Sequence, residues 1–290
     1  MNEHPDDAEV FAERRHLMNL AYRMLGTVAE AEDAVQETYA RWYRMPREDR
    51  DVIEVPRAWL TRVAGRVCLD ILDSARVRRE TYVGPWLPEP VPASSDTDPL
   101  DRVTLDDTIS TALLVVLESM TPAERLAFVL HDVFALPFDE IADIVGRTPA
   151  ACRQLATSAR RRAHDARSWQ VSRAHHDRVV AAFSAAAQTG SLEQLITMLD
   201  PDVVLRSDGG GKRTAARRPV LGADNVGRFL LGLIEKHPEI EIVPRITADG
   251  LAFAYSEGGQ ITGVVNLGVV DDLVAEIWIV LNPDKLTLWN

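Results

Sequence analysis

The chain has 290 residues, of which 46% are hydrophobic and 26% are charged, and its formal net charge is −12. This length accommodates two or three domains, each with its own hydrophobic core. Residues 1–9 lack the basic-then-apolar layout of a signal peptide, and no apolar run approaches the ~20 residues that span a bilayer, so we expect a cytoplasmic protein without a membrane segment.

The first block, residues 8–80, has the pattern of an all-helical domain. Thr27 and Glu30 form a capping box, and an apolar stripe with helical spacing runs through residues 29–43. Beside that stripe the polar side chains Asp33, Gln36 and Glu37 lie three and four residues apart, so they share one face. A binding surface and an ordinary solvated face are both consistent with this trio. A second helix is expected to start near Pro56.

Basic side chains are concentrated in two stretches of this acidic chain. Residues 57–79 carry 6 basic and 2 acidic side chains, and residues 147–168 carry 6 and 1. Such clusters on an acidic background favour DNA contact at two separated places, although solvated helix faces carry them too. Each stretch also contains one cysteine, Cys68 or Cys152, without a second ligand at metal-binding spacing. We therefore expect two buried thiols and no metal site.

Residues 81–105 are expected to form a linker, because Pro and Ser are frequent there and regular apolar spacing is absent. The string Trp86-Leu87-Pro88-Glu89-Pro90 is unusual for such a segment. A linker that needs only flexibility has no use for large apolar side chains, so Trp86 and Leu87 are predicted to dock on another part of the protein.

The second block, residues 106–168, is again helical and contains a helix-turn-helix at about Phe138–Arg162. Thr121, followed by Pro122 and Glu124, is a helix start with a capping box. The second helix of the motif is predicted to pack through Cys152, Ala156 and Ala159. The side chains then turned towards a DNA groove are Pro149, Arg153, Gln154, Thr157 and Arg161. Arg153 and Gln154 suit base reading, and Arg160 and Arg162 suit phosphate contact.

The third block, residues 172–290, predicts an α+β domain. Helices are expected at His175–Ala187, after Ser191 and at Ala223–Lys236, followed by four strands in an antiparallel sheet that curls over the helices. The polar candidates for acid–base chemistry are Asp208, Tyr255 and His237, but no spacing links them. The three glycines in Asp208–Lys212 are typical of either an anion cradle or a plain loop.

Several strings resemble a known family. Ala31–Thr38 looks like the first conserved helix of group IV (extracytoplasmic-function) sigma factors of bacterial RNA polymerase, and Pro56–Asp70 resembles their promoter-opening segment. Three further strings resemble the signatures of the subgroup fused to a SnoaL-like domain, the sigma J type. They are Trp86–Pro90, Asp208–Lys212 and Asn282–Leu286. The implied fold is two all-α sigma domains and a C-terminal SnoaL/NTF2-like cone.

The resemblance also implies roles. The face of Asp33, Gln36 and Glu37 would bind core RNA polymerase at its beta-prime subunit, with a further contact to the beta subunit. The minus-ten DNA contacts would be Arg62, Arg66, Arg76, Arg78 and Arg79, and the helix-turn-helix would read the minus-thirty-five element. The sequence departs from the common group IV pattern at Arg66, where Asn is frequent, and at Asp73, where Arg is frequent.

The resemblance further implies regulation in cis by the third domain. The expected regulatory residues are Trp86, Leu87, Pro88, Asp208, Gly209, Gly210, Gly211, Lys212, Asn282, Pro283, Asp284, Lys285 and Leu286. We expect no enzyme activity, no cofactor, no metal and no need for a separate anti-sigma factor, and we leave open an unidentified small ligand in the cone. Two alternatives remain: a DNA-binding regulator that does not contact polymerase, and a SnoaL-type enzyme tethered to DNA-binding helices.

Overall fold

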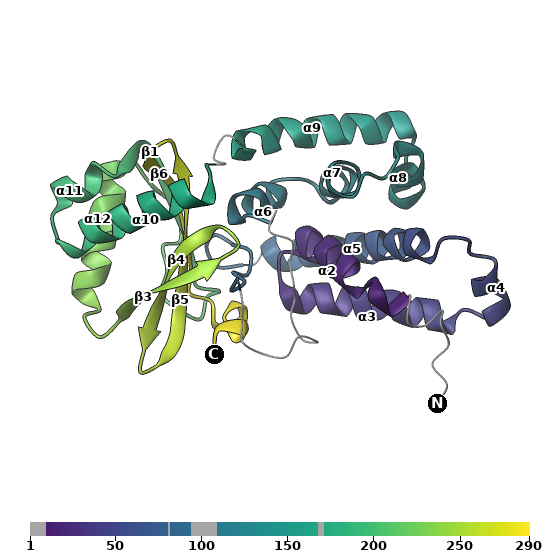
Figure 1. Cartoon of the computed structure of the whole chain (residues 1–290), viewed down its shortest axis with the longest axis horizontal. Helices are drawn as coiled ribbons and strands as arrows, with labels where there is room; N and C mark the ends of the chain where they lie inside the picture. Colours follow the sequence, from purple (N-terminus) through teal and green to yellow (C-terminus); the bar gives the residue numbers. More distant parts are fainter. Residues whose placement is uncertain (1–9, 81, 94–108, 168–170) are drawn as a thin grey trace. The chain divides into compact units, whose positions relative to one another are not determined.

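The computed structural model describes residues 10–80, 82–93, 109–167 and 171–290, with side chains throughout except at 75–80 and 164–167. These residues form two compact units. The first contains residues 10–80 and 116–164 and is helical, drawn in purple to teal in Figure 1. The second contains residues 82–93, 109–115, 165–167 and 171–290 and holds the sheet, drawn in green to yellow (Figure 1).

Three helices form the base of the first unit. Their bounds are Arg14–Leu25 (α2), Val28–Arg44 (α3) and Pro56–Glu80 (α5), with the short α4 at Arg47–Asp51. The Thr27 side chain accepts a hydrogen bond from the Glu30 amide at the start of α3, as predicted. The apolar stripe of α3 faces α2 and α5, so its residues are buried except for the half-buried Tyr39; the buried ones are Ala31, Ala34, Val35, Thr38 and Trp42.

The remaining helices of this unit include the helix-turn-helix. They are α7 (Pro122–Phe128), the π-helical turn η1 (Val129–Val133), α8 (Phe138–Val145) and α9 (Pro149–Arg167). The capping box at Thr121 and Glu124 is present, and Gly146 ends α8 in the left-handed conformation. Cys152, Ala156 and Ala159 are fully buried, which confirms the predicted register of α9. Helix α6 (Thr111–Glu118) begins in the second unit and ends in the first.

The second unit is a six-stranded sheet with helices. Its helices are α10 (Arg173–Gln188), α11 (Leu192–Ile196) and α12 (Ala223–Lys236), with two 3₁₀ turns near the C-terminus, η2 (Pro283–Lys285) and η3 (Thr287–Trp289). Its strands are β1 (Leu199–Asp208), β2 (Val220–Leu221), β3 (Glu241–Thr247), β4 (Gly250–Glu257), β5 (Gln260–Val270) and β6 (Leu273–Val280). The strand order is β2-β1-β6-β5-β4-β3.

The sheet is mixed, so the prediction of a purely antiparallel sheet was wrong at one pairing. Strand β1 was not predicted, and it pairs parallel to β6. Parallel neighbours require a long connection, and α12 with strands β3 to β5 supplies it. The register between β1 and β6 shifts between Leu199 and Val204, around Pro201, which cannot donate to the ladder.

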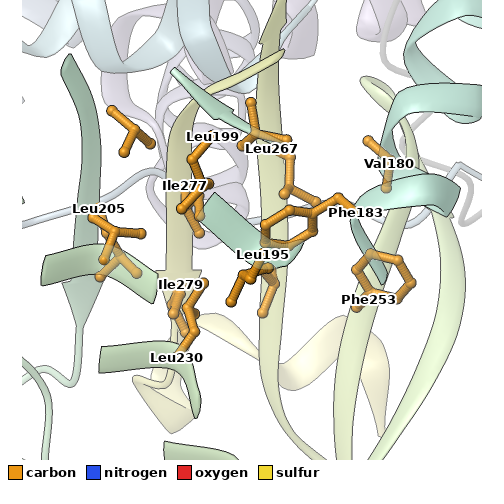
Figure 2. Packing of buried hydrophobic residues seen from close by; sticks show 14 of the residues in the cluster. Val180, Phe183, Leu195, Leu199, Leu205, Leu230, Phe253, Leu267, Ile277 and Ile279 are labelled. Carbon is orange, nitrogen blue, oxygen red and sulfur yellow. The ribbon is translucent and has the colours of Figure 1, made fainter. Parts of the chain in front are cut away.

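The two faces of the sheet bury different clusters. The face towards α10, α11 and α12 carries the larger core, which includes Phe183, Leu230, Phe253 and Ile277 (Figure 2). The opposite face carries a second cluster, the linker cluster, formed by Leu87, Ala112, Ala254, Ile261, Val264, Trp278, Val280 and Leu286. The linker and the start of α6 therefore cover one face of the sheet, and helices cover the other.

Within the described residues, no helix is both long and apolar enough to cross a membrane. In the same residues no three His, Cys, Asp or Glu side chains gather as a metal ion would require. Cys68 and Cys152 are free thiols and buried, as predicted. Burial raises the pKa of Cys68 to about 12, so this thiol stays protonated and unreactive.

Candidate functional site: linker dock and nucleic-acid surfaces

Asp208 lies at the end of β1 and is completely buried on the linker face of the sheet. Its carboxylate accepts hydrogen bonds from the Tyr82 hydroxyl, from the Leu87 amide at 3.0 Å and from the Gly210 amide at 3.0 Å. Burial and the hydrogen bond to Asp208 raise the pKa of Tyr82, which keeps the hydroxyl a donor. One carboxylate thus holds two points of the linker.

Lys285 supplies the charge that compensates this buried carboxylate. Its Nζ lies 2.7 Å from Oδ2 of Asp208 and also donates to the Leu87 carbonyl. The same ammonium sits 3.8 Å from the centroid of the Trp86 ring, within cation–π range. All three signature strings therefore meet at one point, which we call the linker dock: Tyr82, Trp86, Leu87, Asp208, Gly210, Asn282 and Lys285.

The glycines of Asp208–Lys212 permit close approach within the dock. Gly210 has a φ of 61°, and a Cβ there would lie 2.4 Å from the Asn282 side chain. A Cβ on Gly209 would lie 2.2 Å from the Arg213 carbonyl oxygen. Gly211 lies beside Val83 of the linker. The glycines thus have a packing role, and an anion cradle is not needed to explain them.

Signature residues around the dock differ in burial. Leu87 is only 1% exposed and packs in the linker cluster with Leu286. Pro88 is also buried, whereas Pro283 is exposed. Lys212 and Asp284 form an exposed ion pair at 2.7 Å. Such a pair contributes little to stability, so the energy of docking comes from the buried groups.

The linker has further contacts that the sequence reasoning missed. Trp289 donates through Nε1 to the Pro90 carbonyl at 2.8 Å, and the Ala93 amide donates to the Ile246 carbonyl at 2.9 Å. Tyr82 was also missed, and it bonds both Asp208 and Asn282. An aromatic residue just before the Trp86–Pro90 string was the available signal.

A second anchor holds the start of α6. The Asp249 carboxylate, in the turn between β3 and β4, accepts from the Thr111 amide at 2.8 Å and from the Thr111 hydroxyl. Asn266 donates to that hydroxyl at 3.0 Å and accepts from Thr247 at 3.2 Å. Burial raises the pKa of Asp249, although the bonds from Thr111 oppose the shift. In the sequence Asp249 is followed by Gly250, a pair typical of a turn, and no pattern there relates it to Thr111.

Helix α9 presents the predicted DNA-reading side chains to solvent. The exposed ones are Arg153, Gln154, Thr157, Arg160 and Arg161, whereas Pro149 is half-buried at the helix start. Arg153 lies over the Phe138 ring at 5.7 Å from its centroid. Arg160 pairs with Asp132 at 2.7 Å, which reduces its availability for phosphate. Arg162 bonds the Ser119 carbonyl and Glu124, which indicates a structural role.

The basic side of α5 lies against α8 within the first unit. Arg66 donates to the Asp143 carbonyl at 2.6 Å, and Arg62 lies 3.8 Å from Glu140. Helix α5 extends through Arg76, Arg78 and Arg79, but these three side chains lie outside the described residues. Both of these described arginines therefore contact the helix-turn-helix, Arg66 through a hydrogen bond and Arg62 through an ion pair.

The candidate polymerase-binding face is open on α3. Asp33 and Gln36 are exposed, and Glu37 is half-buried because it pairs with Arg41 at 2.9 Å. No residue of the described chain covers Asp33 or Gln36 through a hydrogen bond or ion pair. The face therefore has the exposure that a partner surface requires.

The three candidates for acid–base chemistry do not converge. Tyr255 belongs to the core under the helices, whereas Asp208 lies on the opposite face of the sheet with Lys285. His237 is exposed at the end of α12 and bonds Glu239 at 3.0 Å. A general acid and base must both reach one substrate, so these residues do not form a catalytic pair.

Comparison with known proteins identifies both helical parts. Residues 10–79 match Sigma-70 region 2, and residues 110–162 match Sigma-70, region 4. The chain is 42% identical to the ECF RNA polymerase sigma factor SigJ of Mycobacterium tuberculosis, over 97% of this chain and 93% of the relative. It is 38% identical to that organism's probable ECF RNA polymerase sigma factor SigI, over 99% and 97%. The crystal structure of M. tuberculosis SigJ matches with a TM-score of 0.77 at 39% identity, over 97% and 98% of the two chains.

Proposed function

Because the chain belongs to the extracytoplasmic-function RNA polymerase sigma factors, we propose that its C-terminal domain regulates promoter recognition in cis by holding the linker between the two sigma regions. A sigma factor directs transcription initiation through core RNA polymerase and promoter DNA, and this family is not enzymatic. Within that function, Asp33, Gln36 and Glu37 are assigned to the beta-prime subunit. Region 4 is assigned to the beta subunit and the minus-thirty-five element.

The observation that carries cis regulation is the buried bonding of Asp208 to the linker. A tether at Leu87 and Tyr82, together with the anchor at Thr111, fixes both described ends of the segment between the sigma regions to the C-terminal domain. Fixed ends restrict the distance that this segment spans, and hence the separation available to the two DNA-binding parts. Because the regulatory domain is part of the same chain, this proposal requires no separate anti-sigma factor. We propose that the protein acts in the cytoplasm.

The packing of α5 on α8 adds a second restraint. Elements at minus ten and minus thirty-five lie roughly 25 base pairs apart, or about 85 Å at ~3.4 Å per base pair. Arg66 and Asp143 are joined by a 2.6 Å hydrogen bond, so the two DNA-binding parts touch in this arrangement. We infer that core polymerase separates α5 from α8 before the promoter is bound at both elements.

Transcription by core polymerase on a library of randomised promoters tests the sigma function and its regulation in cis. The full chain, a truncation after Arg167 and the variants Trp86→Ala and Lys285→Met are compared by sequencing their transcripts. Lys236→Met, an exposed lysine on α12, is the matched control. Cis regulation predicts that the truncation and both dock variants change the yield or the preferred spacing between promoter elements, and that the control does not.

The results distinguish a failure of cis regulation from a failure of the sigma function. Identical yields and spacings from all forms would reject cis regulation while leaving the sigma function intact. Tight binding of the isolated chain to promoter duplexes, without transcription from any library member, would instead support a regulator that acts without polymerase.

A further inference from the structure

The C-terminal domain contains a cavity on the face of the sheet opposite the linker dock. Its volume is about 520 Å³, within the range of about 300–1,000 Å³ that is typical of small-molecule sites. It lies between α10 and α12 and has β3 to β6 as its floor. The inner wall includes Phe183, Leu230, Phe253, Val265 and Ile277. Figure 2 shows Phe183 and Phe253 in this part of the core.

The wall holds one buried hydrogen-bonding side chain. Tyr255 retains 7% of its exposed surface and lines the cavity. Within the described part of the chain no residue exchanges a hydrogen bond with its hydroxyl. Burial raises the pKa of Tyr255, so the hydroxyl is a neutral donor at physiological pH. A ligand acceptor in the cavity would therefore find this donor available, and such a hydrogen bond contributes about 0.5–1.5 kcal/mol net.

The rim indicates the charge and polarity of the occupant. Ile234 and Ile242 line the mouth, where they keep 40% and 40% of their exposed surface. Glu235, also exposed, is the one charged side chain among the lining residues that the structure describes, and none of those residues is a cation. The Glu235 carboxylate would repel an anionic ligand, because no positive charge in the lining offsets it. A highly polar ligand would lose its hydration against the apolar wall without gaining hydrogen bonds.

We propose that this cavity binds an uncharged, largely apolar small molecule whose single carbonyl or similar oxygen accepts a hydrogen bond from Tyr255. This site is separate from the linker dock, because residues that face the cavity and residues that face the dock alternate along the strands. Ile277 faces the cavity, for example, and Trp278 faces the linker cluster. The proposal is independent of cis regulation.

Titration of the full chain with prodan tests this proposal. Prodan is a neutral dimethylaminonaphthalene with one ketone, and its fluorescence shifts to the blue in apolar surroundings. We expect saturable binding that Tyr255→Phe weakens roughly fivefold, the loss of one net hydrogen bond. The same dimethylaminonaphthalene without the ketone should bind the native chain and Tyr255→Phe equally, because it offers no acceptor there.

A second pair of variants locates the site. Ala187 lines the cavity on α10, whereas Ala185 on the same helix is exposed and does not line it. Ala187→Phe should reduce prodan affinity at least tenfold, and Ala185→Phe should leave it unchanged. Equal affinity of the native chain and Tyr255→Phe for prodan would overturn the proposed contact. A native chain that dimerises, and that Ala187→Phe makes monomeric in sedimentation, would instead assign the cavity to a second copy.

Discussion

The Lys285 ammonium lies 2.7 Å from the Asp208 carboxylate, and their side chains keep only 5% and 0% of their exposed surface. Each charge is removed from water and depends on the other for compensation. The pair also bonds the linker, because Lys285 donates to the Leu87 carbonyl and Asp208 accepts from the Leu87 amide. Linker docking and charge compensation are therefore one interaction.

Replacing Lys285 with methionine should release the linker. The substitution leaves the buried Asp208 carboxylate uncompensated, at a cost of about 3 kcal/mol. We expect a lower urea midpoint and at least tenfold faster hydrogen exchange at the Leu87 amide, measured by NMR or mass spectrometry. Lys212→Met, which breaks the exposed pair with Asp284, should change stability by less than about 1 kcal/mol. Unchanged exchange at Leu87 in Lys285→Met would contradict the linker dock.

Asp249→Ala should free the start of α6. The Thr111 amide and hydroxyl both lose their acceptor, and bonds to a charged group contribute about 1.5–3 kcal/mol each. Hydrogen exchange at Thr111 should accelerate more than tenfold while exchange in β5 stays slow. The matched control is Asp224→Ala, whose carboxylate has only the exposed partner Arg228. Equal protection of Thr111 in both variants would show that Asp249 does not anchor the helix.

The sequence predicted the helices whose first and last residues are marked by helix-starting or helix-ending residue types. Helix α8 begins at Phe138, where the helix-turn-helix was expected to begin, because Pro137 precedes it, and Gly146 closes it. Helix α12 also has its expected bounds, between Gly222 and His237. Strand β1 was missed because Pro201 and Asp202 interrupt its alternation, and only its tertiary partner β6 completes it. Residues next to a helix define where it begins and ends, whereas the pairing of a strand depends on residues that are distant in the sequence.

The sequence predicted which strings belong to the candidate site, but it did not predict the contacts that their side chains make. Resemblance marked Asp208 and Lys285 as residues of interest, and the sequence marked Trp86 as one that must dock. The ion pair across 77 positions and the two bonds of Tyr82 follow only from the fold. Asp249 and Thr111 lie 138 positions apart, so no spacing relates them. A hydrogen-bond partner contributed by another element leaves no local pattern.

Core polymerase should move α5 away from α8. Asp70 on α5 and Arg147 at the helix-turn-helix are exposed, and the two native cysteines are buried, so Asp70→Cys with Arg147→Cys accepts dyes selectively. We expect high energy-transfer efficiency in the free chain and a marked fall on addition of core polymerase. Core polymerase that binds without changing the efficiency would reject separation of the two parts. A pair on α5 and α2, Asp70→Cys with Arg15→Cys, provides the control that should not change, because these two helices pack on each other and Arg15 is exposed.

The base-reading and phosphate-binding roles on α9 should separate by salt dependence. Arg153→Ala should cost about 1–3 kcal/mol at one promoter position and relax its sequence preference, because a bidentate contact to guanine is lost. Arg160→Ala should weaken binding evenly across sequences and reduce the salt slope by up to about one, the loss of one phosphate contact. Holoenzyme binding to selected promoters at several salt concentrations measures both. Equal loss at every sequence in Arg153→Ala would assign Arg153 to phosphate instead.

The Glu276 carboxyl should make the stability of the C-terminal domain depend on pH. Burial raises its pKa to about 7, although the ion pair with Arg206 opposes the shift. The folded state therefore retains the proton to a higher pH than the unfolded chain, whose carboxyl titrates near 4.5. This contribution to stability is complete below pH ~4.5 and is lost as the pH rises through ~7.

Glu276→Gln tests that dependence, because glutamine is uncharged at every pH. Between pH 5 and pH 8 the native chain should lose stability relative to the variant by about 1–3 kcal/mol, measured from urea midpoints. The exposed Glu257, replaced by glutamine, should follow the native profile. A variant whose stability falls with pH in parallel with the native chain would show that the Arg206 pair already keeps Glu276 ionised. The carboxylate would then stabilise the sheet between β1 and β6 at neutral pH.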